Sequence, residues 1–241
     1  MRNNDTYTVV YAAGICLISS LLLAVTASGL RQQQERMAES DRKFNVLKSF
    51  QADVFRPDGG RIGVEQIEEM YAHHVAEGLY SSASGELLDP NKKQEMKSGT
   101  TASDALPVYR WTDEGQVSKY AIPISGSGLW GPIYGYLALD RGLETIIGVS
   151  FYRHQETPGL GAEIEKSAFT QPFQGQKIFK NDSLRIVEVV KGRVADRYPS
   201  GAPGVAVDGI SGATITGRGV STFMTRNLQS YDRVFRALRK N

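Results

Sequence analysis

The longest hydrophobic pattern in the chain is an apolar run from about Thr6 to Leu30 that contains no charged residue. Roughly 20 apolar residues in a helix cross the hydrocarbon core of a bilayer. A charge at the centre would cost about 2.5–3.5 kcal/mol, so this run predicts a transmembrane helix. A cleaved signal peptide is the alternative, because small residues suitable for cleavage stand at 24–28. The run exceeds the roughly 7–15 apolar residues of a signal-peptide core, which favours a retained helix.

Further helical patterns follow the apolar run. Residues 32–40 are polar and helix-prone, and we expect them to prolong the first helix as a stalk. Residues 44–50 then present a short apolar face, and residues 64–80 have the spacing of an amphipathic helix. The next stretch, 81–106, is rich in Ser, Lys, Asp and Thr, which predicts a long surface loop.

Strand patterns dominate the middle of the chain. Four short segments rich in β-branched and aromatic residues, joined by short Gly, Ser and Pro turns, predict an antiparallel sheet. A further strand is expected at 184–190, and a brief helical segment at 162–167. From about Gly217 to Leu238 the apolar residues recur as one helical stripe. The four expected sheet strands are 108–111, 118–124, 133–139 and 145–152.

These patterns together predict an α+β fold: an antiparallel sheet with packed helices, anchored by one N-terminal transmembrane helix. We expect residues 1–31 to form the anchor. Residues 32–241 are then expected to form one soluble domain, because a chain of 241 residues is too short to argue for several cores.

Composition excludes several kinds of site. The net charge of +2 lacks the strongly basic face of a nucleic-acid-binding protein, so no nucleic acid is expected as a partner. Cys16 is the single cysteine, which excludes an internal disulfide and a cysteine-held zinc ion or iron–sulfur cluster. His73, His74 and His154 are too few and too poorly spaced for a metal site, so we expect no metal and exposed or hydrogen-bonded histidines.

The segment 208–216 is the strongest candidate for a functional site. It reads DGISGATIT and links an extended run at 204–207 to the final helical pattern. Small side chains leave backbone N–H groups uncovered near a helix start, which is a natural place for a phosphate. Ser211 and Thr214 supply hydroxyls, and Asp208 could orient one of them. By spacing alone, such a small polar loop before a helix is more often an ordinary turn with helix caps.

A resemblance changes this interpretation. Residues 208–214 resemble the flavinylation motif of the FMN-binding family, in which a flavin transferase moves FMN from FAD onto a threonine as a phosphoester. The resemblance implies that Thr214 is the acceptor of a covalent FMN and that Asp208 is the acidic residue of the motif. Thr216, a second hydroxyl, lies outside the matched acceptor position. The loop that the transferase must grip is Ser211, Gly212 and Ala213.

A second segment, ETPGLG at 156–161, resembles another signature of the same family. Pro158 followed by Gly159 predicts a turn with positive φ at the glycine. The resemblance implies that this turn approaches the flavin, and a type II turn without a ligand is the alternative. The candidate cofactor-binding residues here are Glu156, Thr157, Leu160 and Gly161.

A third segment, GSGLWGPIYGYLAL at 126–139, looks like the corresponding run in the C subunit of sodium-translocating NADH:quinone oxidoreductases. The G subunit of Rnf electron-transport complexes shares the overall plan and the other two motifs. Trp130 in this run is a candidate wall of the flavin pocket, and a buried core aromatic is the alternative role.

The resemblance implies an electron carrier without catalytic residues of its own. In such complexes NADH is oxidised on another subunit, electrons pass through flavins and an iron–sulfur centre to quinone, and sodium export is coupled to that flow. The implied partners are the other subunits, a flavin transferase during maturation, and the membrane. The sequence agrees in having no GxGxxG motif that leads from a strand into a helix, because GSGLWG at 126–131 lies between two expected strands. It also has only one membrane-spanning pattern.

The side of the membrane follows from the resemblance rather than from charge. The family implies a single-pass protein of the bacterial inner membrane with a periplasmic flavin domain. Read literally, the positive-inside rule favours a cytoplasmic domain, but large domains translocate largely regardless of such a bias. The flanking charges are Arg2 before the apolar run and Arg31, Arg36, Arg42 and Lys43 after it.

Three alternatives stay open at this point. One is the Rnf-type flavoprotein subunit, and another is a flavin-free membrane-tethered scaffold. The third is a hydrolase using Ser211 or Thr214, which the absence of a GxSxG elbow disfavours.

Overall fold

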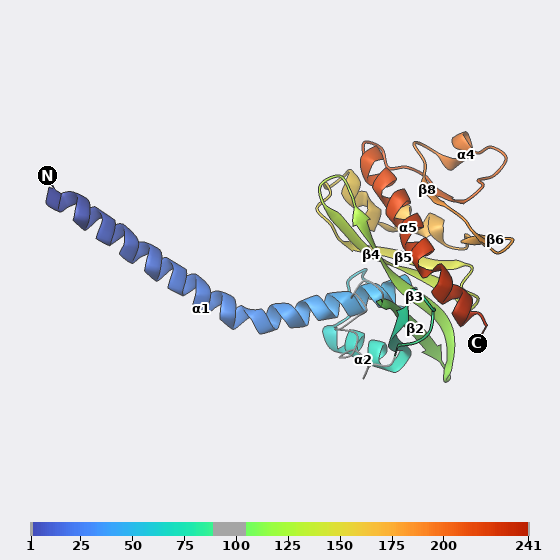
Figure 1. Cartoon of the computed structure of the whole chain (residues 1–241), viewed down its shortest axis with the longest axis horizontal. Helices are drawn as coiled ribbons and strands as arrows, with labels where there is room; N and C mark the ends of the chain where they lie inside the picture. The colour runs from blue at the N-terminus through green and yellow to red at the C-terminus, as the bar shows by residue number, and fades with distance from the viewer. Residues whose placement is uncertain (1, 89–104, 241) are drawn as a thin grey trace. The chain divides into compact units, whose positions relative to one another are not determined.

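A computed structural model describes residues 2–88 and 105–240 (Figure 1). Helix α1 (Arg2–Ser49) is continuous over the expected transmembrane run and stalk, and it extends nine residues beyond Ser40. Within the described residues, it is the one helix that could cross a membrane by length and composition. Because a signal sequence near the N-terminus meets the same criteria, cleavage remains the alternative.

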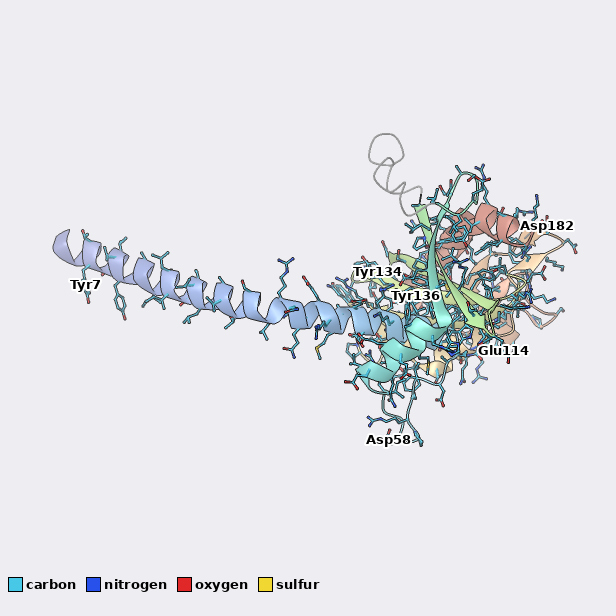
Figure 2. All side chains as sticks on the ribbon, turned by 90° about the horizontal axis from the view of Figure 1, so that it is seen from below. Tyr7, Asp58, Glu114, Tyr134, Tyr136 and Asp182 are labelled. Atoms are coloured by element: carbon cyan, nitrogen blue, oxygen red, sulfur yellow. The ribbon has the colours of Figure 1, made fainter. Side chains whose placement is uncertain are left out.

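The chain divides into two compact units, residues 1–42 and 43–241. The first unit is the part of α1 up to Arg42, and the large apolar side chains of its run at 6–30 are exposed. Tyr7, labelled in Figure 2, is 73% exposed and stacks on Tyr11 with ring centroids 6.2 Å apart. A helix with exposed apolar residues all round is the pattern of a lipid-facing segment. The boundary between anchor and domain at residue 31 stays a prediction.

The second unit is built on a five-stranded antiparallel sheet in the order β1-β2-β3-β4-β5. All four strands expected from the sequence are present; the first three are longer than expected, and the fourth has the expected length but begins one residue later. The strands are β1 (Val75–Ser81), β2 (Ala105–Asp113), β3 (Gln116–Ser127), β4 (Pro132–Asp140) and β5 (Ile146–Arg153). The predicted α+β class is therefore confirmed.

The expectation of one helix over 64–80 is wrong in its second half. Helix α2 (Val64–His74) ends where β1 begins, and Val75 pairs opposite Trp111 of β2. The apolar spacing of residues 75–80 fits a helix as well as a strand. Gly78 is a poor helix former, and pairing with β2 gives the backbone groups of this segment hydrogen-bond partners. The expected loop at 81–106 is shorter at its C-terminal end, because Ala105 already belongs to β2, and residues 89–104 lie outside the described part.

The sheet separates two apolar clusters because neighbouring residues of a strand point to opposite faces. Leu137 and Leu139 belong to the larger cluster, whereas Tyr136 and Ala138 belong to the smaller one. Helix α5 (Thr214–Leu238) covers the first face and runs across the sheet in Figure 1. The last turns of α1 and helix α2 contribute to the cluster on the other face, which includes Tyr136, labelled in Figure 2. The helix expected from about Gly217 is confirmed, and it begins three residues earlier, at Thr214.

Short elements join β5 to α5. The brief helical segment expected at 162–167 is found as η3 (Gly161–Glu165), followed by α3 (Ser167–Thr170) and η4 (Gln171–Phe173). The prediction of a single strand at 184–190 is wrong, because the extended pairing is interrupted at Arg185 between two short strands. The guanidinium of Arg185 donates to the carbonyls of Ala202 and Gly204. The remaining elements are β6 (Phe179–Lys180), β7 (Ser183–Leu184), β8 (Val187–Val189), α4 (Val194–Arg197) and β9 (Val205–Val207), with β8 and β9 parallel.

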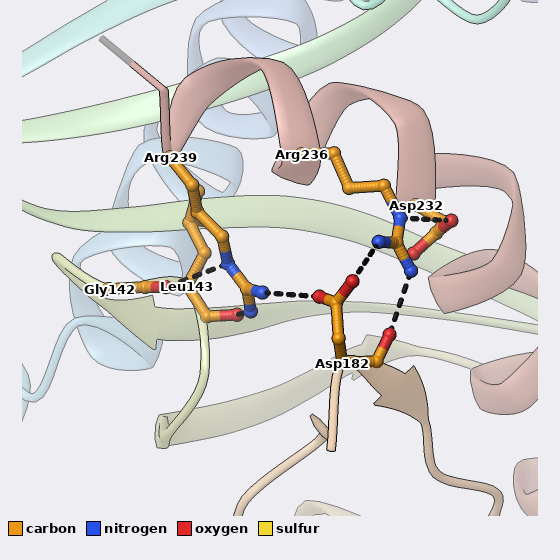
Figure 3. Close-up of polar contacts among 6 residues, drawn as sticks. All are labelled: Gly142, Leu143, Asp182, Asp232, Arg236 and Arg239. Atoms are coloured by element: carbon orange, nitrogen blue, oxygen red, sulfur yellow. Dashed lines mark hydrogen bonds and ion pairs between the residues drawn. The ribbon is translucent and has the colours of Figure 1, made fainter. Parts of the chain in front are cut away.

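The end of α5 is fastened to two turns (Figure 3). Arg236 Nη1 lies 2.6 Å from Asp182 Oδ2 in the β6–β7 turn, and its Nε donates to Asp232. Arg239 donates to the carbonyls of Gly142 and Leu143 between β4 and β5. Exposed ion pairs of this kind add little stability singly, but together they fix the direction of a helix whose first residue belongs to the candidate site.

Candidate functional site at the start of helix α5

The loop 208–213 connects β9 to α5, as the sequence predicted. Gly212 has φ of +74°, which a residue with a side chain rarely adopts, and Ala213 N donates to Ile210 O at 3.1 Å. A Cβ added to Gly212 would lie 2.8 Å from Leu160 Cδ2. The glycine therefore permits both the tight turn and close contact with the second motif, so the two sequence motifs meet in space.

Thr214 is the first residue of α5 and is exposed, as is Ser211, whereas Ala213 is buried. Thr214 also lines a cavity of about 290 Å³ between the start of α5 and the segment after β8. Asp208 is exposed, and its Oδ1 accepts from Val194 N at 2.7 Å. This contact holds the loop to the start of α4, so the hydrogen bond of Asp208 serves the backbone rather than a hydroxyl.

The second motif forms the turn that its sequence predicted. Leu160 N donates to Thr157 O at 3.1 Å, with Pro158 and Gly159 between them, and Gly159 has φ of +74°. This is a turn with proline at its second position and a positive-φ glycine at its third, which is the type II pattern. The turn leaves the side chain of Leu160 42% exposed beside the loop that precedes Thr214.

The carboxylate of Glu156 joins three segments of the site. The residue is 5% exposed, and its Oε1 accepts from the backbone N–H groups of Leu129 at 2.9 Å and Trp130 at 3.1 Å. Its Oε2 accepts from the hydroxyl of Thr216 at 2.5 Å. A Cβ on Gly161 would lie 2.6 Å from the same Oε2, so this glycine makes room for the carboxylate. Glu156 and Gly161 therefore hold segments of the protein itself together, a role that the sequence did not indicate.

Trp130 is 64% exposed, which overturns the alternative that it is a core aromatic. Its Nε1 donates to Thr157 Oγ1 at 3.1 Å, so the indole is tied to the ETPGLG turn. Leu129, Leu160 and Ile215 are exposed apolar residues of the same loops and of the first turn of α5. Exposed apolar groups gathered at a site indicate a surface that binds a ligand or a partner.

His154 contacts the backbone of Glu156. Its Nδ1 accepts from Glu156 N at 3.1 Å, which leaves the ring proton on Nε2, and that nitrogen lies 2.8 Å from Glu165 Oε1. The sequence predicted a hydrogen-bonded histidine but gave no sign of its partners, because the contacts depend on the turn.

Comparison with known proteins identifies the family. Residues 128–229 match the model of the FMN-binding domain family. The C subunit of the Na⁺-translocating NADH-quinone reductase of Yersinia pestis is 33% identical over 91% of this chain and 87% of its own length. The chain belongs to this family of Na⁺-translocating NADH-quinone reductase C subunits, NqrC. The NqrC of Pseudomonas aeruginosa is 28% identical over 92% of this chain and 91% of its own length.

Solved structures of NqrC proteins have the same fold. The crystal structure from Parabacteroides distasonis aligns with a TM-score of 0.69 at 32% identity, covering 86% of this chain and 96% of that one. The structure of NqrC from Shewanella oneidensis, at 24% identity and a TM-score of 0.66, shows the likeness of fold alone. Membership of the NqrC family favours the C-subunit interpretation of the sequence over the Rnf-type alternative.

The FMN-binding domain of this NqrC-family protein includes every candidate residue named from the sequence. Residues 128–229 include the exposed Trp130, the ETPGLG turn and the loop before Thr214. The match also includes two residues that the motifs did not point to, Lys191 and Arg218, which line the cavity with Thr214. Arg218 could have been found from the sequence, because it follows Thr214 by one helical turn. The long apolar α1 agrees with membrane association.

We expect Glu156→Ala to lower the free energy of unfolding by about 2–4 kcal/mol, because it strands two backbone N–H groups and the hydroxyl of Thr216. Urea titration of the full chain in detergent, followed by circular dichroism, measures this. The matched control is Glu163→Ala, which removes only an ion pair to Lys166 at the surface and should change stability by at most about 1 kcal/mol. Equal losses in both variants would contradict the assignment.

Proposed function

We propose that this chain is the flavin-carrying subunit of a Na⁺-translocating NADH-quinone reductase and that it holds FMN through a phosphoester on Thr214. The observation that carries the proposal is the contrast between two neighbouring hydroxyls. Thr214 is exposed at the rim of a cavity, in the acceptor position of the motif. Thr216 is 1% exposed, and its hydroxyl donates a hydrogen bond to Glu156, so it is unavailable for modification.

The residues present fit such a cofactor. The small-residue turn at Gly212 leaves the approach to Thr214 open, and Trp130 and Leu160 offer exposed apolar surface to a flat ring. FMN supplies electron transfer in one- or two-electron steps when bound. The chain's own residues position it: Thr157 orients the indole of Trp130, while Glu156 and Gly161 hold the loops together.

A covalent link keeps the FMN on a chain that can bury only part of it. Non-covalent binding at a nanomolar dissociation constant needs about 12 kcal/mol of net free energy. Side chains that are half exposed, such as Leu129 and Leu160, can bury only part of a ring. A phosphoester removes dissociation and leaves one face of the ring open to redox partners. Thr214 is thus an attachment residue, and we assign no catalytic residue to this chain.

The proposal extends to partners and location. NADH oxidation, quinone reduction and sodium translocation belong to the other subunits of the complex, and a flavin transferase loads the FMN. Residues 1–31 anchor the chain in a bacterial inner membrane, and residues 32–241 form the flavin domain in the periplasm. Family membership and the apolar face of α1 support this arrangement.

We expect Thr214→Ala to abolish covalent flavin when the chain is made together with a flavin transferase. The wild-type chain should exceed its polypeptide mass by one FMN less one water, and its denatured band should fluoresce under ultraviolet light. Both signals should vanish in Thr214→Ala and persist in Thr222→Ala, a matched exposed threonine two turns along α5. A wild-type chain without added mass would remove the proposal.

We expect Trp130→Ala to raise the fluorescence of the attached flavin in the native protein without changing the amount attached. An indole that lies against the isoalloxazine quenches its emission, and removing the indole relieves the quenching. Steady-state emission normalised to flavin absorbance measures this. The control is Trp111→Phe, in the smaller apolar cluster on the other face of the sheet from α5. Unchanged emission in Trp130→Ala would show that the indole does not contact the ring.

We expect a membrane-impermeant maleimide to label a cysteine placed at Thr222 in cells whose inner membrane is intact. The background is Cys16→Ser, so that the introduced thiol is the single one. A cysteine at Asn3, before the apolar run, is the control and should react only after lysis. The reverse pattern would place the flavin domain in the cytoplasm.

A further inference from the structure

The cavity beside Thr214 is formed by close packing of β8 on the first turns of α5. Val189 N donates to Ser221 Oγ at 2.8 Å. A Cβ added to Gly217 would lie 3.0 Å from Val189 Cγ1, so the absence of a side chain there lets strand and helix approach. The cavity of about 290 Å³ opens directly beyond this contact.

Two cations line this cavity together with the acceptor threonine. Lys191 follows β8, and its segment is held against the flavinylation loop because Val190 N donates to Val207 O and Gly209 N donates to Gly192 O, at 3.0 and 2.8 Å. Arg218 stands four residues after Thr214 on α5, and side chains at that spacing are neighbours on one helical face.

Lys191 and Arg218 form no ion pair within residues 2–88 and 105–240, although the carboxylate of Glu188 lines the same cavity. Neither side chain makes an ion pair or a hydrogen bond there, and both are exposed. The nearby carboxylates have other partners: Glu188 accepts from the Tyr198 hydroxyl, and Asp208 accepts from Val194 N. The positive end of the 25-residue helix α5 adds to the same potential at its first residue. The cavity lining therefore carries two cations, neither of them in an ion pair, against the single carboxylate of Glu188 beside the hydroxyl of Thr214.

We propose that Lys191 and Arg218 are positioning residues for the flavinylation of Thr214: they hold the phosphoryl group that is transferred and then pair with the phosphodiester that results. The inference rests on the proposed function. In the transfer, Thr214 Oγ forms a bond to the phosphorus of the FMN half of FAD, the phosphoanhydride bond to the AMP half breaks, and AMP leaves. The hydroxyl proton passes to a base of the transferase or to water.

The charge of the product suits the pair. A phosphodiester carries one negative charge. Negative charge also develops on the oxygens around phosphorus while the bond from Thr214 Oγ forms and the phosphoanhydride bond breaks. Cations fixed on the acceptor chain then act during transfer as well as afterwards. Two other roles give different results: solvated surface charges would affect nothing, and docking contacts for the transferase would affect only its affinity for the chain.

The experiment measures initial rates of FMN incorporation into the purified full chain in detergent, by intact mass, with FAD and a bacterial flavin transferase. The acceptor concentration is varied to separate kcat from KM. The variants are Lys191→Gln, Arg218→Gln and the double change. The controls are Lys180→Gln on β6 and Arg226→Gln, two turns after Arg218 on α5, and each removes the same charge outside the cavity.

We expect each cavity variant to lower kcat about tenfold, and the double variant about a hundredfold, because a charge-assisted contact to phosphate is lost each time. The controls should stay within about twofold of wild type, and the charge-conserving Lys191→Arg and Arg218→Lys should recover most of the loss. Circular dichroism should be unchanged, because both side chains are exposed and unpartnered in the described structure.

Two results would overturn the inference: cavity variants as fast as the controls, or a rise in KM for the acceptor with kcat unchanged. Failure of the proposed function looks different, because the wild-type chain itself would then gain no FMN under any condition.

Discussion

The buried carboxylate of Glu156 is the contact on which the arrangement of the site depends. It gathers the 128–131 turn, the ETPGLG segment and the first turn of α5 through hydrogen bonds to Leu129, Trp130 and Thr216. A charged group almost without exposure is stable only when its oxygens are satisfied. The same requirement makes the three segments interdependent, since displacing one of them leaves the carboxylate short of a donor. Loops that would otherwise be mobile can therefore carry exposed functional groups at fixed places.

Helical geometry then distinguishes the two threonines of the motif. Residues two apart on a helix point about 200° away from one another, because each residue turns about 100°. With Thr216 directed at Glu156, Thr214 must face the opposite side, where the cavity lies. The contact that fixes the loops also determines which hydroxyl reaches solvent. The fastening of the far end of α5 by Arg236 and Arg239 fixes the direction of the same helix.

Much of this structure can be predicted from local patterns, and the exceptions have physical causes. The apolar run, the four central strands and the loop before α5 are all visible as periodicity or composition, and they are found in the structure. The segment 75–81 was missed, because its apolar spacing fits a helix as well as a strand, and the pairing with β2 decides between them. The break at Arg185 was missed for a similar reason, since it depends on carbonyls of a distant loop. The motifs indicated Thr214, but the partners of the Glu156 carboxylate lie 26 or more residues away in sequence. The place of Lys191 beside Thr214 depends on the cavity that the folded chain forms.

The exposure of Thr214 has a consequence for the order of events in the maturation of the protein. Thr214, the proposed acceptor, is already exposed in the folded chain, and no core residue has to move to uncover it. Under the proposed function, folding can thus be completed before FMN is attached, and the folded apoprotein is itself the substrate for the attachment. Only a chain whose loops have assembled around the buried carboxylate displays the small-residue turn in its final shape. A loading enzyme that reads that turn would therefore select correctly folded molecules.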